Sequence, residues 1–242
     1  MNNSNPSENV RDLLAALEHD PRIDLKAYPI QLIEQDDRLI LEGTVANIAA
    51  KKLTLRIAQR VCATCPVLDR LHVAAARIDD GELHTAVADI LLGEPVFADY
   101  GMRVKNGSEW EIWRVSKSEL GENMDIEAHQ GVVTLSGRVG SLTHRRVAEV
   151  LTWWTAGCEL VENRLRVVPP EKENDGELTD AVRIVLEKDP MVQSEQISIN
   201  VQHGEVTLNG YVSSEEERRL AILDAWYVPG VREVVDHIQA WP

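Results

Sequence analysis

The chain has 242 residues and a formal net charge of −15, from 25 basic and 40 acidic side chains. Hydrophobic residues make up 44% of it and charged residues 27%, which is typical of a folded globular protein and argues against disorder as the main state. The acidic balance disfavours nucleic-acid binding, because that binding depends on lysine and arginine side chains that neutralise phosphates.

The expected location follows from three features of the sequence. The first residues have no basic segment followed by an apolar one, and no stretch approaches the roughly 18 apolar residues of a membrane-spanning helix. The cysteines are odd in number, which suits a reducing compartment better than a disulfide framework. We expect a cytoplasmic protein without a signal peptide or a transmembrane segment, with association at the inner face of the membrane left open.

A repeated pattern surrounds three glycines, Gly43, Gly137 and Gly210. Each has a leucine two positions before it and a valine two positions after it, and a basic pair begins eight positions on. The basic pairs are Lys51-Lys52, Arg145-Arg146 and Arg218-Arg219. The number of matched positions predicts three tandem copies of one small module.

Each copy is expected to begin with a helix, because apolar residues recur at helical spacing in 10–18 and 178–186. An acid–proline pair ends that helix, since the residue before proline avoids the α region. Two strands joined by a tight turn follow and lead to the repeat glycine. A second helix and a third strand complete the copy, and good N-cap residues for this helix are Asn47, Ser141 and Ser214.

The predicted fold class is α+β, with three tandem αββαβ sandwich modules, each a three-stranded mixed sheet covered by two helices. The repeat glycines are interpreted as positions where a helix packs tightly on the sheet, with a ligand contact as the alternative. The expected domains are a flexible tail over 1–9 and modules over 10–78, 82–169 and 177–242. The second module has an insertion at about 98–123, a hairpin or loop, in which Asn106-Gly107 offers a turn.

The pattern resembles the BON domain, named for bacterial osmotic-shock and nodulation proteins. The resemblance rests on the strand-glycine segments VTLSGRV and VTLNGYV and on the endings CELVENRLRV and PGVREVVDHI. It implies an αββαβ sandwich without catalytic residues. It also implies association with phospholipid or the cell envelope, a link to osmotic stress and the protection of other proteins, and in some members the binding of small ligands or ions.

Tryptophans and the basic pairs are the candidate contact residues. The tryptophans either pack between neighbouring modules or form a surface for a protein partner or lipid, as such residues often do; they are Trp110, Trp113, Trp153, Trp154 and Trp226. The basic pairs either belong to a solvated helix face or contact lipid phosphates; the candidates are Arg145, Arg146, Arg218 and Arg219.

Catalytic, metal and nucleotide motifs receive no support. Cys62 and Cys65 form a C-x-x-C without a second ligand pair, and they fall at a predicted helix C-terminus, where the helix dipole raises the pKa of a thiol. The histidines form no metal-binding or catalytic spacing, and no phosphate-binding glycine motif occurs. We therefore expect no catalytic residue, no bound metal and no cofactor.

The sequence predicts a non-enzymatic, cytoplasmic binding or scaffolding protein. It would associate with a protein partner or with a membrane phospholipid surface, in connection with stress. One alternative is a sensor that binds a small ligand or a cation, and a second is an enzyme of unrecognised type. The sequence does not fix the oligomeric state.

Overall fold

The computed structural model describes residues 8–35, 37–63 and 65–241. The chain divides into two compact units, Met1–Ala74 and Ala75–Pro242. Most of the tail predicted over 1–9 lies outside the described residues, while residues 8 and 9 already belong to the first helix. No helix among the described residues is both long and apolar enough to cross a membrane.

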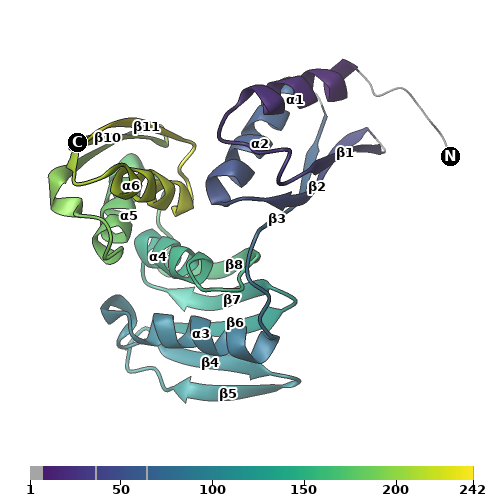
Figure 1. Ribbon diagram of the computed structural model, residues 1–242. Helices are drawn as coiled ribbons and strands as arrows, with labels where there is room; N and C mark the ends of the chain where they lie inside the picture. The colour runs from purple at the N-terminus through teal and green to yellow at the C-terminus, as the bar shows by residue number, and fades with distance from the viewer. Residues whose placement is uncertain (1–7, 36, 64, 242) are drawn as a thin grey trace. The chain divides into compact units, whose positions relative to one another are not determined.

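The first unit is one two-layer module. Its two helices cover one face of a three-stranded sheet, in which β1 is antiparallel and β3 parallel to the central strand β2 (Figure 1). Leucines of β2 and of both helices fill the space between the two layers. Its elements are α1 (Glu8–His19), β1 (Ile30–Gln35), β2 (Arg38–Val45), α2 (Ile48–Val61) and β3 (Val67–Val73).

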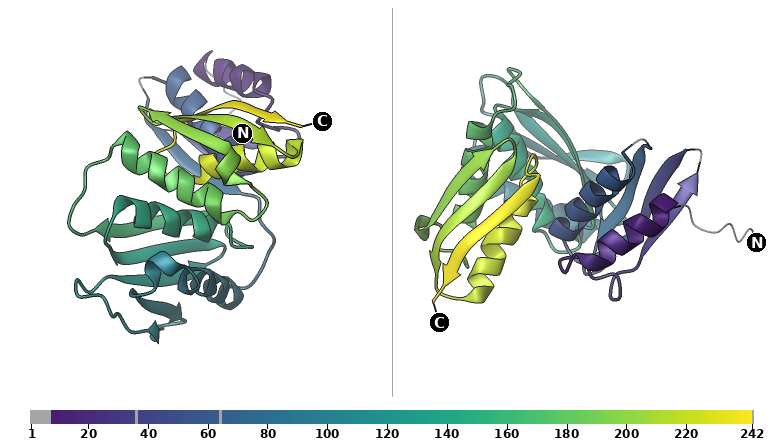
Figure 2. Two further views of the ribbon diagram at one scale, coloured as in Figure 1. Left: turned by 90° about the vertical axis from the view of Figure 1, so that its left-hand side faces the viewer. Right: turned by 90° about the horizontal axis from the view of Figure 1, so that it is seen from above.

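The second unit contains two further modules of this kind, and in each the helices cover one face of the sheet (Figure 2). Helix α4 packs against α5, which joins the two helical layers. The first of these modules comprises α3 (Asp80–Leu92), η1 (Pro95–Phe97), β4 (Gly101–Asn106), β5 (Glu109–Arg114), β6 (Asn123–His129), β7 (Val132–Val139), α4 (Leu142–Trp153) and β8 (Leu160–Val167). The last comprises α5 (Asp175–Lys188), η2 (Ser194–Gln196), β9 (Ile197–Gln202), β10 (Glu205–Val212), α6 (Glu215–Tyr227) and β11 (Glu233–Ala240).

The predicted α+β fold class, with repeated two-layer modules, is confirmed, but the middle sheet has five strands rather than three. The segment predicted as an insertion forms the hairpin β4–β5, which turns at Gly107-Ser108, one residue later than the predicted Asn106-Gly107. Strand β4 pairs in parallel with β6, so the hairpin extends the sheet in the order β5-β4-β6-β7-β8. Strand β5 thereby becomes an edge strand.

The repeat glycines share one unusual backbone environment. Gly43, Gly137 and Gly210 have φ values of +141°, +122° and +149°, a region that only glycine adopts freely. A Cβ atom at any of them would lie within 3.0 Å of a backbone carbonyl oxygen at or just before the start of the neighbouring strand; these oxygens belong to Pro29, Asn123 and Gln196. Glycine is therefore required by close strand approach, and the interpretation as a helix-packing position is wrong.

The second helix of every module begins as predicted. The side chains of Asn47, Ser141 and Ser214 accept a hydrogen bond from the backbone N–H three residues later. Such a cap satisfies one of the N–H groups that a helix leaves unpaired at its start.

Arg114 fixes the inserted hairpin to the helical layer. Its guanidinium donates to the carbonyl oxygens of Tyr100 at 2.7 Å and Leu92 at 3.3 Å, and also to that of Phe97. Burial lowers the pKa of this guanidinium. One cation thus ties the end of β5 to the end of α3 and to the 3-10 turn that follows it.

We expect Arg114→Ala to destabilise the protein by about 2–3 kcal/mol, because three carbonyl oxygens lose a charged donor. Arg164→Ala on β8 is the control. The Arg164 side chain is 68% exposed and pairs with Glu162, which is 42% exposed, so its loss is expected to cost about 1 kcal/mol or less. Urea denaturation measures both, and equal losses would contradict the assigned role of Arg114.

Candidate functional site

Strand β5 presents apolar side chains to solvent at the edge of the middle sheet. Trp110 is 42% exposed and Ile112 is 68% exposed, and Trp113 is half-buried. Arg103 and Lys105 of β4 lie 5.4 and 5.9 Å from the centre of the Trp110 ring, so cation–π attraction holds this indole in place. We call residues 109–112, together with the open side of their backbone, the β5 edge.

Other tryptophans proposed as contact residues lie in the interior. Trp226 is 2% exposed and Trp153 is 7% exposed, which excludes both from a flat outer surface. Each lies near the end of the second helix of its module, 16 residues after the repeat glycine. Trp154, next to Trp153, is half-buried.

The first residue of the repeated basic pair forms an ion pair inside its own module in the first and the last module. Lys51 pairs with Asp69 at 3.0 Å and Arg218 pairs with Asp236 at 2.7 Å, and in both cases a helix is joined to the last strand. Arg145, the equivalent residue, is half-buried. These contacts leave the first position poorly suited to a lipid phosphate.

The burial and the contacts of the second residue of the pair differ between the last two modules. Arg146 is 3% exposed; its guanidinium pairs with Glu173 and donates to the carbonyl of Pro229 at 3.1 Å. This burial excludes Arg146 from a lipid contact, because no vesicle can reach it. Arg219 is exposed and pairs with Glu216 at 2.6 Å on the helix surface, in line with a solvated helix face.

The sequence analysis missed the acidic partners of Lys51 and Arg218 and the equivalent residue of the middle module. Asp69, Asn163 and Asp236 each lie 26 residues after the repeat glycine, and each side chain accepts the backbone N–H two residues later. An acid or amide at one fixed offset was the signal that would have identified them. The repeat therefore contains a structural polar contact as well as an apolar pattern.

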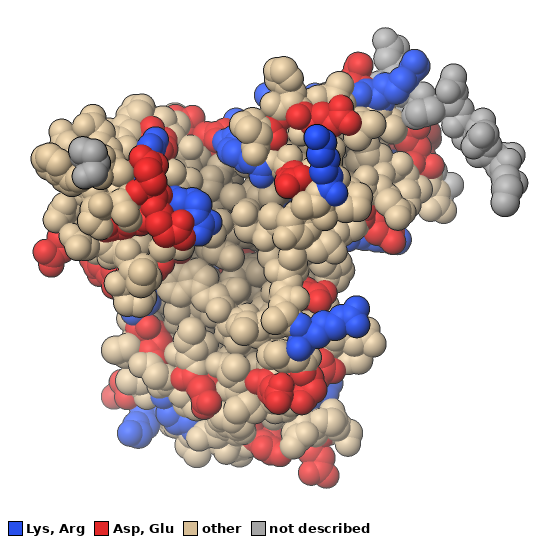
Figure 3. Space-filling model, viewed as in Figure 1, with Lys and Arg blue, Asp and Glu red and all other residues tan. Residues whose placement is uncertain are grey.

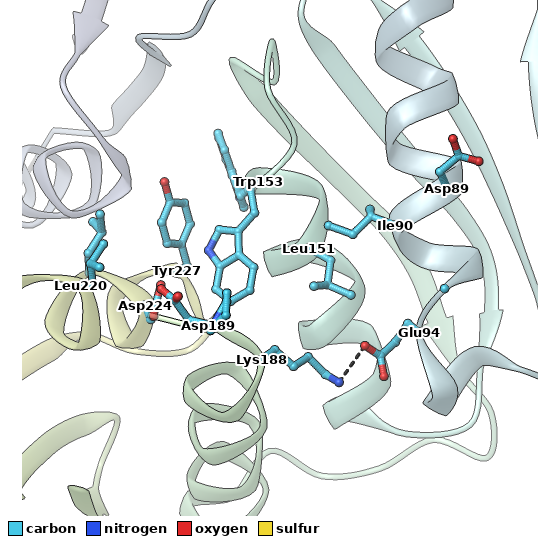
Figure 4. Close-up of a pocket in the computed structure, with 14 residues that line it drawn as sticks. Asp89, Ile90, Glu94, Leu151, Trp153, Lys188, Asp189, Leu220, Asp224 and Tyr227 are labelled. Atoms are coloured by element: carbon cyan, nitrogen blue, oxygen red, sulfur yellow. Dashed lines mark ion pairs between the residues drawn. The ribbon is translucent and has the colours of Figure 1, made fainter. Parts of the chain in front are cut away.

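A cleft lies between the helical layers of the two modules in the second unit (Figure 4). Its volume is about 790 Å³, and it is enclosed by the ends of α3, α4 and α5 and by one face of α6. Its apolar and aromatic walls include Ile90, Leu151, Trp153, Trp154, Leu220, Leu223 and Tyr227. A cleft of this size accommodates a small organic molecule or a protruding side chain.

The polar side chains of the cleft fall into two groups. Glu94, which is buried, pairs with Lys188 at 2.7 Å, as the dashed line in Figure 4 shows. Asp224 is 3% exposed and lies beside Asp189; no hydrogen-bond partner reaches its Oδ2 atom. Burial raises the pKa of Asp224 to about 8, and the charge of the adjacent Asp189 and a side-chain interaction with that carboxyl add to the shift.

A sequence signal for Asp224 was present but was not used. The residues 14 positions after the other two repeat glycines are Ile57 and Leu151, both buried and apolar. The third module replaces them with a carboxyl group. A buried acid at a position that is apolar in sister modules indicates a function that the shared fold does not need.

Cys62 and Cys158 lie in environments that favour the thiol. Burial raises the pKa of Cys62 to about 11 and that of Cys158 to about 12. In the part of the chain that the structure describes, no cluster of three or more His, Cys, Asp or Glu side chains could hold a metal ion. Neither observation gives the C-x-x-C pair a redox or metal-binding role.

The BON domain family matches residues 114–169 and 174–240. Because these ranges cover just over half of the 242 residues, the chain belongs to the BON domain family. The two matches fall on the two modules of the second unit and do not reach the first, so they do not confirm a third copy. No curated protein matches the chain.

Solved structures show distant similarity. The C-terminal domain of CdsD, described as the structural protein of the type III secretion system of Chlamydia trachomatis, matches at 15% identity and a TM-score of 0.25, with 99% of this chain and 100% of that chain covered. The PrgH periplasmic domain matches at 11% identity and a TM-score of 0.24, with coverage of 88% and 95%. Values this low support no inference about activity or partners.

The predicted cytoplasmic location is contradicted by this comparison, because PrgH is described there by its periplasmic domain and CdsD as a secretion-system component. The TM-scores are too low to put another compartment in its place.

Asp224 makes the stability of the protein depend on pH. Because burial raises the pKa of Asp224 to about 8, the folded protein holds a proton on this carboxyl at pH values where the unfolded chain, with the ordinary aspartate pKa of 3.8, has released it. Stability therefore falls as pH rises through this window. We expect Asp224→Asn to gain stability relative to the wild type between about pH 5 and about pH 8, by at most about 1.4 kcal/mol per pH unit.

Urea denaturation at several pH values measures this difference. Asp180→Asn, which removes an exposed carboxyl group on α5, is the control and should keep a constant offset from the wild type. A constant offset for Asp224→Asn as well would contradict a protonated Asp224.

Proposed function

We propose that this chain is a non-enzymatic binding or scaffolding protein that holds a protein partner at the β5 edge. The observation that carries the proposal is the exposure of Trp110 and Ile112 on an edge strand. Among the described residues, β5 pairs with β4 alone, so one side of its backbone is open. Such an edge accepts an extended segment of another protein as an additional strand.

The partner segment is expected to combine apolar and basic side chains. Ile112 and Trp110 offer apolar contact, and an aromatic residue of this kind often dominates an interface. Glu109 and Glu111 alternate with them along the strand and are exposed. A lysine or arginine at alternate positions of the incoming strand would complement these carboxylates.

A protein partner is better supported than a phospholipid surface. Lys51, Arg146 and Arg218 are engaged by carboxylates within the protein. On the face drawn in Figure 3, lysine and arginine side chains are interspersed with aspartate and glutamate rather than gathered together. A net charge of −15 adds general repulsion from anionic lipid.

The first unit is proposed as a third, divergent BON module. Its elements follow the same αββαβ order as α5–β11, and its sheet has the same arrangement of one antiparallel and one parallel neighbour. The environment of Gly43 supports this assignment, since it matches those of Gly137 and Gly210. The module limits 10–78, 82–169 and 177–242 are part of this proposal.

The double variant Trp110→Ala/Ile112→Lys should lose the partner while the fold stays intact, because both side chains are exposed. The full chain is immobilised and used for affinity capture from its native cell. Hydrogen exchange on the recovered complex should show new amide protection in β5. Tyr211→Ala, at another exposed aromatic residue, should retain the partner.

Retention of the same partner by the double variant would contradict the proposal. Flotation with vesicles of anionic phospholipid at low salt tests the membrane alternative directly. If the wild type floats with the vesicles and the double variant does not, the β5 edge is a lipid surface and a protein partner is ruled out there.

A further inference from the structure

We propose that the cleft of the second unit binds an organic cation, a primary ammonium or guanidinium group carried on an alkyl chain. This site is separate from the β5 edge and does not depend on the function proposed for it. The inference rests on the unpaired Asp224 carboxyl, on the excess of acidic groups and on the aromatic walls.

The Asp224 carboxyl points to a missing donor. Buried polar atoms in folded proteins nearly always have a hydrogen-bond partner, because desolvation without one is costly. Asp224 is buried, lines the cleft, and has no partner for Oδ2. A ligand with N–H groups that enters the cleft would supply that partner.

The charges of the cleft select the sign of the ligand. The side chains that line it include four acids, Asp89, Glu94, Asp189 and Asp224, and one base, Lys188. Lys188 is already paired with Glu94, which leaves Asp89 and Asp189, and Asp224 once it is ionised, without a compensating cation in the lining. A positively charged ligand matches this excess.

The aromatic walls favour an organic cation over a bare ion. Trp153, Trp154 and Tyr227 line the same cleft as the two neighbouring acids, and Figure 4 shows the Trp153 and Tyr227 rings close to Asp189 and Asp224. Aromatic faces attract ammonium and guanidinium groups, and the apolar parts of the wall suit an alkyl chain. A small metal ion would leave most of the 790 Å³ volume unfilled.

Proton release should accompany binding. The raised pKa of Asp224, which burial and the neighbouring Asp189 cause, keeps this carboxyl largely protonated near neutrality. A cation at the carboxyl favours the ionised form and displaces the proton. The other groups that face the site are Tyr227 on α6, Lys188 at the end of α5, and Asp89 and Glu94 at the end of α3 and beyond it. Affinity should therefore rise with pH up to about 8.

The test is a calorimetric titration of the full chain with n-butylammonium chloride, together with a thermal shift. Its neutral analogue n-butanol, potassium chloride and magnesium chloride serve as comparison ligands. Putrescine and Nα-acetyl-lysine methylamide then distinguish a free amine from a side chain of a partner protein. We expect butylammonium to bind and to raise the melting temperature, and the comparison ligands to do neither at the same concentration.

Three variants separate binding from folding. Asp224→Asn should weaken butylammonium binding at least about tenfold. Asp224→Leu, which introduces the residue found at Leu151 in the sister module, should fold and should abolish binding. Asp180→Asn and the double variant at the β5 edge should bind like the wild type. Equal binding of butanol, an equal effect of either inorganic salt, or unchanged binding by Asp224→Leu would overturn the proposal.

Discussion

A close approach between two strands constrains every module of this protein. A backbone carbonyl oxygen at or just before the start of the antiparallel neighbour would lie within 3.0 Å of the Cβ atom of any larger residue at Gly43, Gly137 or Gly210. That contact sets the register of the antiparallel pair, in which these glycines face Ile30, Met124 and Ile197. The register in turn decides which side chains face the helices, because shifting a strand by one residue exchanges its two faces.

The candidate binding sites lie where the structure or sequence of one module differs from that of the others. The middle module gains a hairpin, and Arg114 holds it to the end of α3 while β5 is left as an open edge. The last module has Asp224 at a position where its sister modules bury Ile57 and Leu151. The shared positions, including the basic residues that pair with Asp69 and Asp236, stabilise the modules instead.

The sequence predicted the fold class well because its signals are local and repeated. Apolar spacing, acid–proline helix ends and N-cap residues each describe one element, and the recurrence of the pattern along the chain reinforced each prediction. The five-stranded sheet could not be predicted in this way. Alternation in residues 109–114 indicates a strand but does not say that β4 would pair in parallel with β6.

The candidate sites were predicted less completely, because burial depends on neighbouring elements. Arg146 and Trp153 lie on α4. The apolar spacing of α4 does not indicate that α5 and the linker before it cover these side chains. The cleft depends on the packing of α4 against α5, and this contact leaves no pattern within either helix. Only the comparison of Asp224 with its equivalents in the other modules could have indicated the cleft in advance.

Alanine substitution at each repeat glycine tests the central constraint most directly, with the free energy of unfolding measured by urea denaturation. Gly107 is the control, since its φ is +61° and no atom lies within 4 Å of an added Cβ. Gly107→Ala should cost about 1 kcal/mol. Alanine at Gly43, Gly137 or Gly210 should each cost about 3 kcal/mol or more, because strain adds to the collision with a carbonyl oxygen. A repeat-glycine variant as stable as Gly107→Ala would contradict the account.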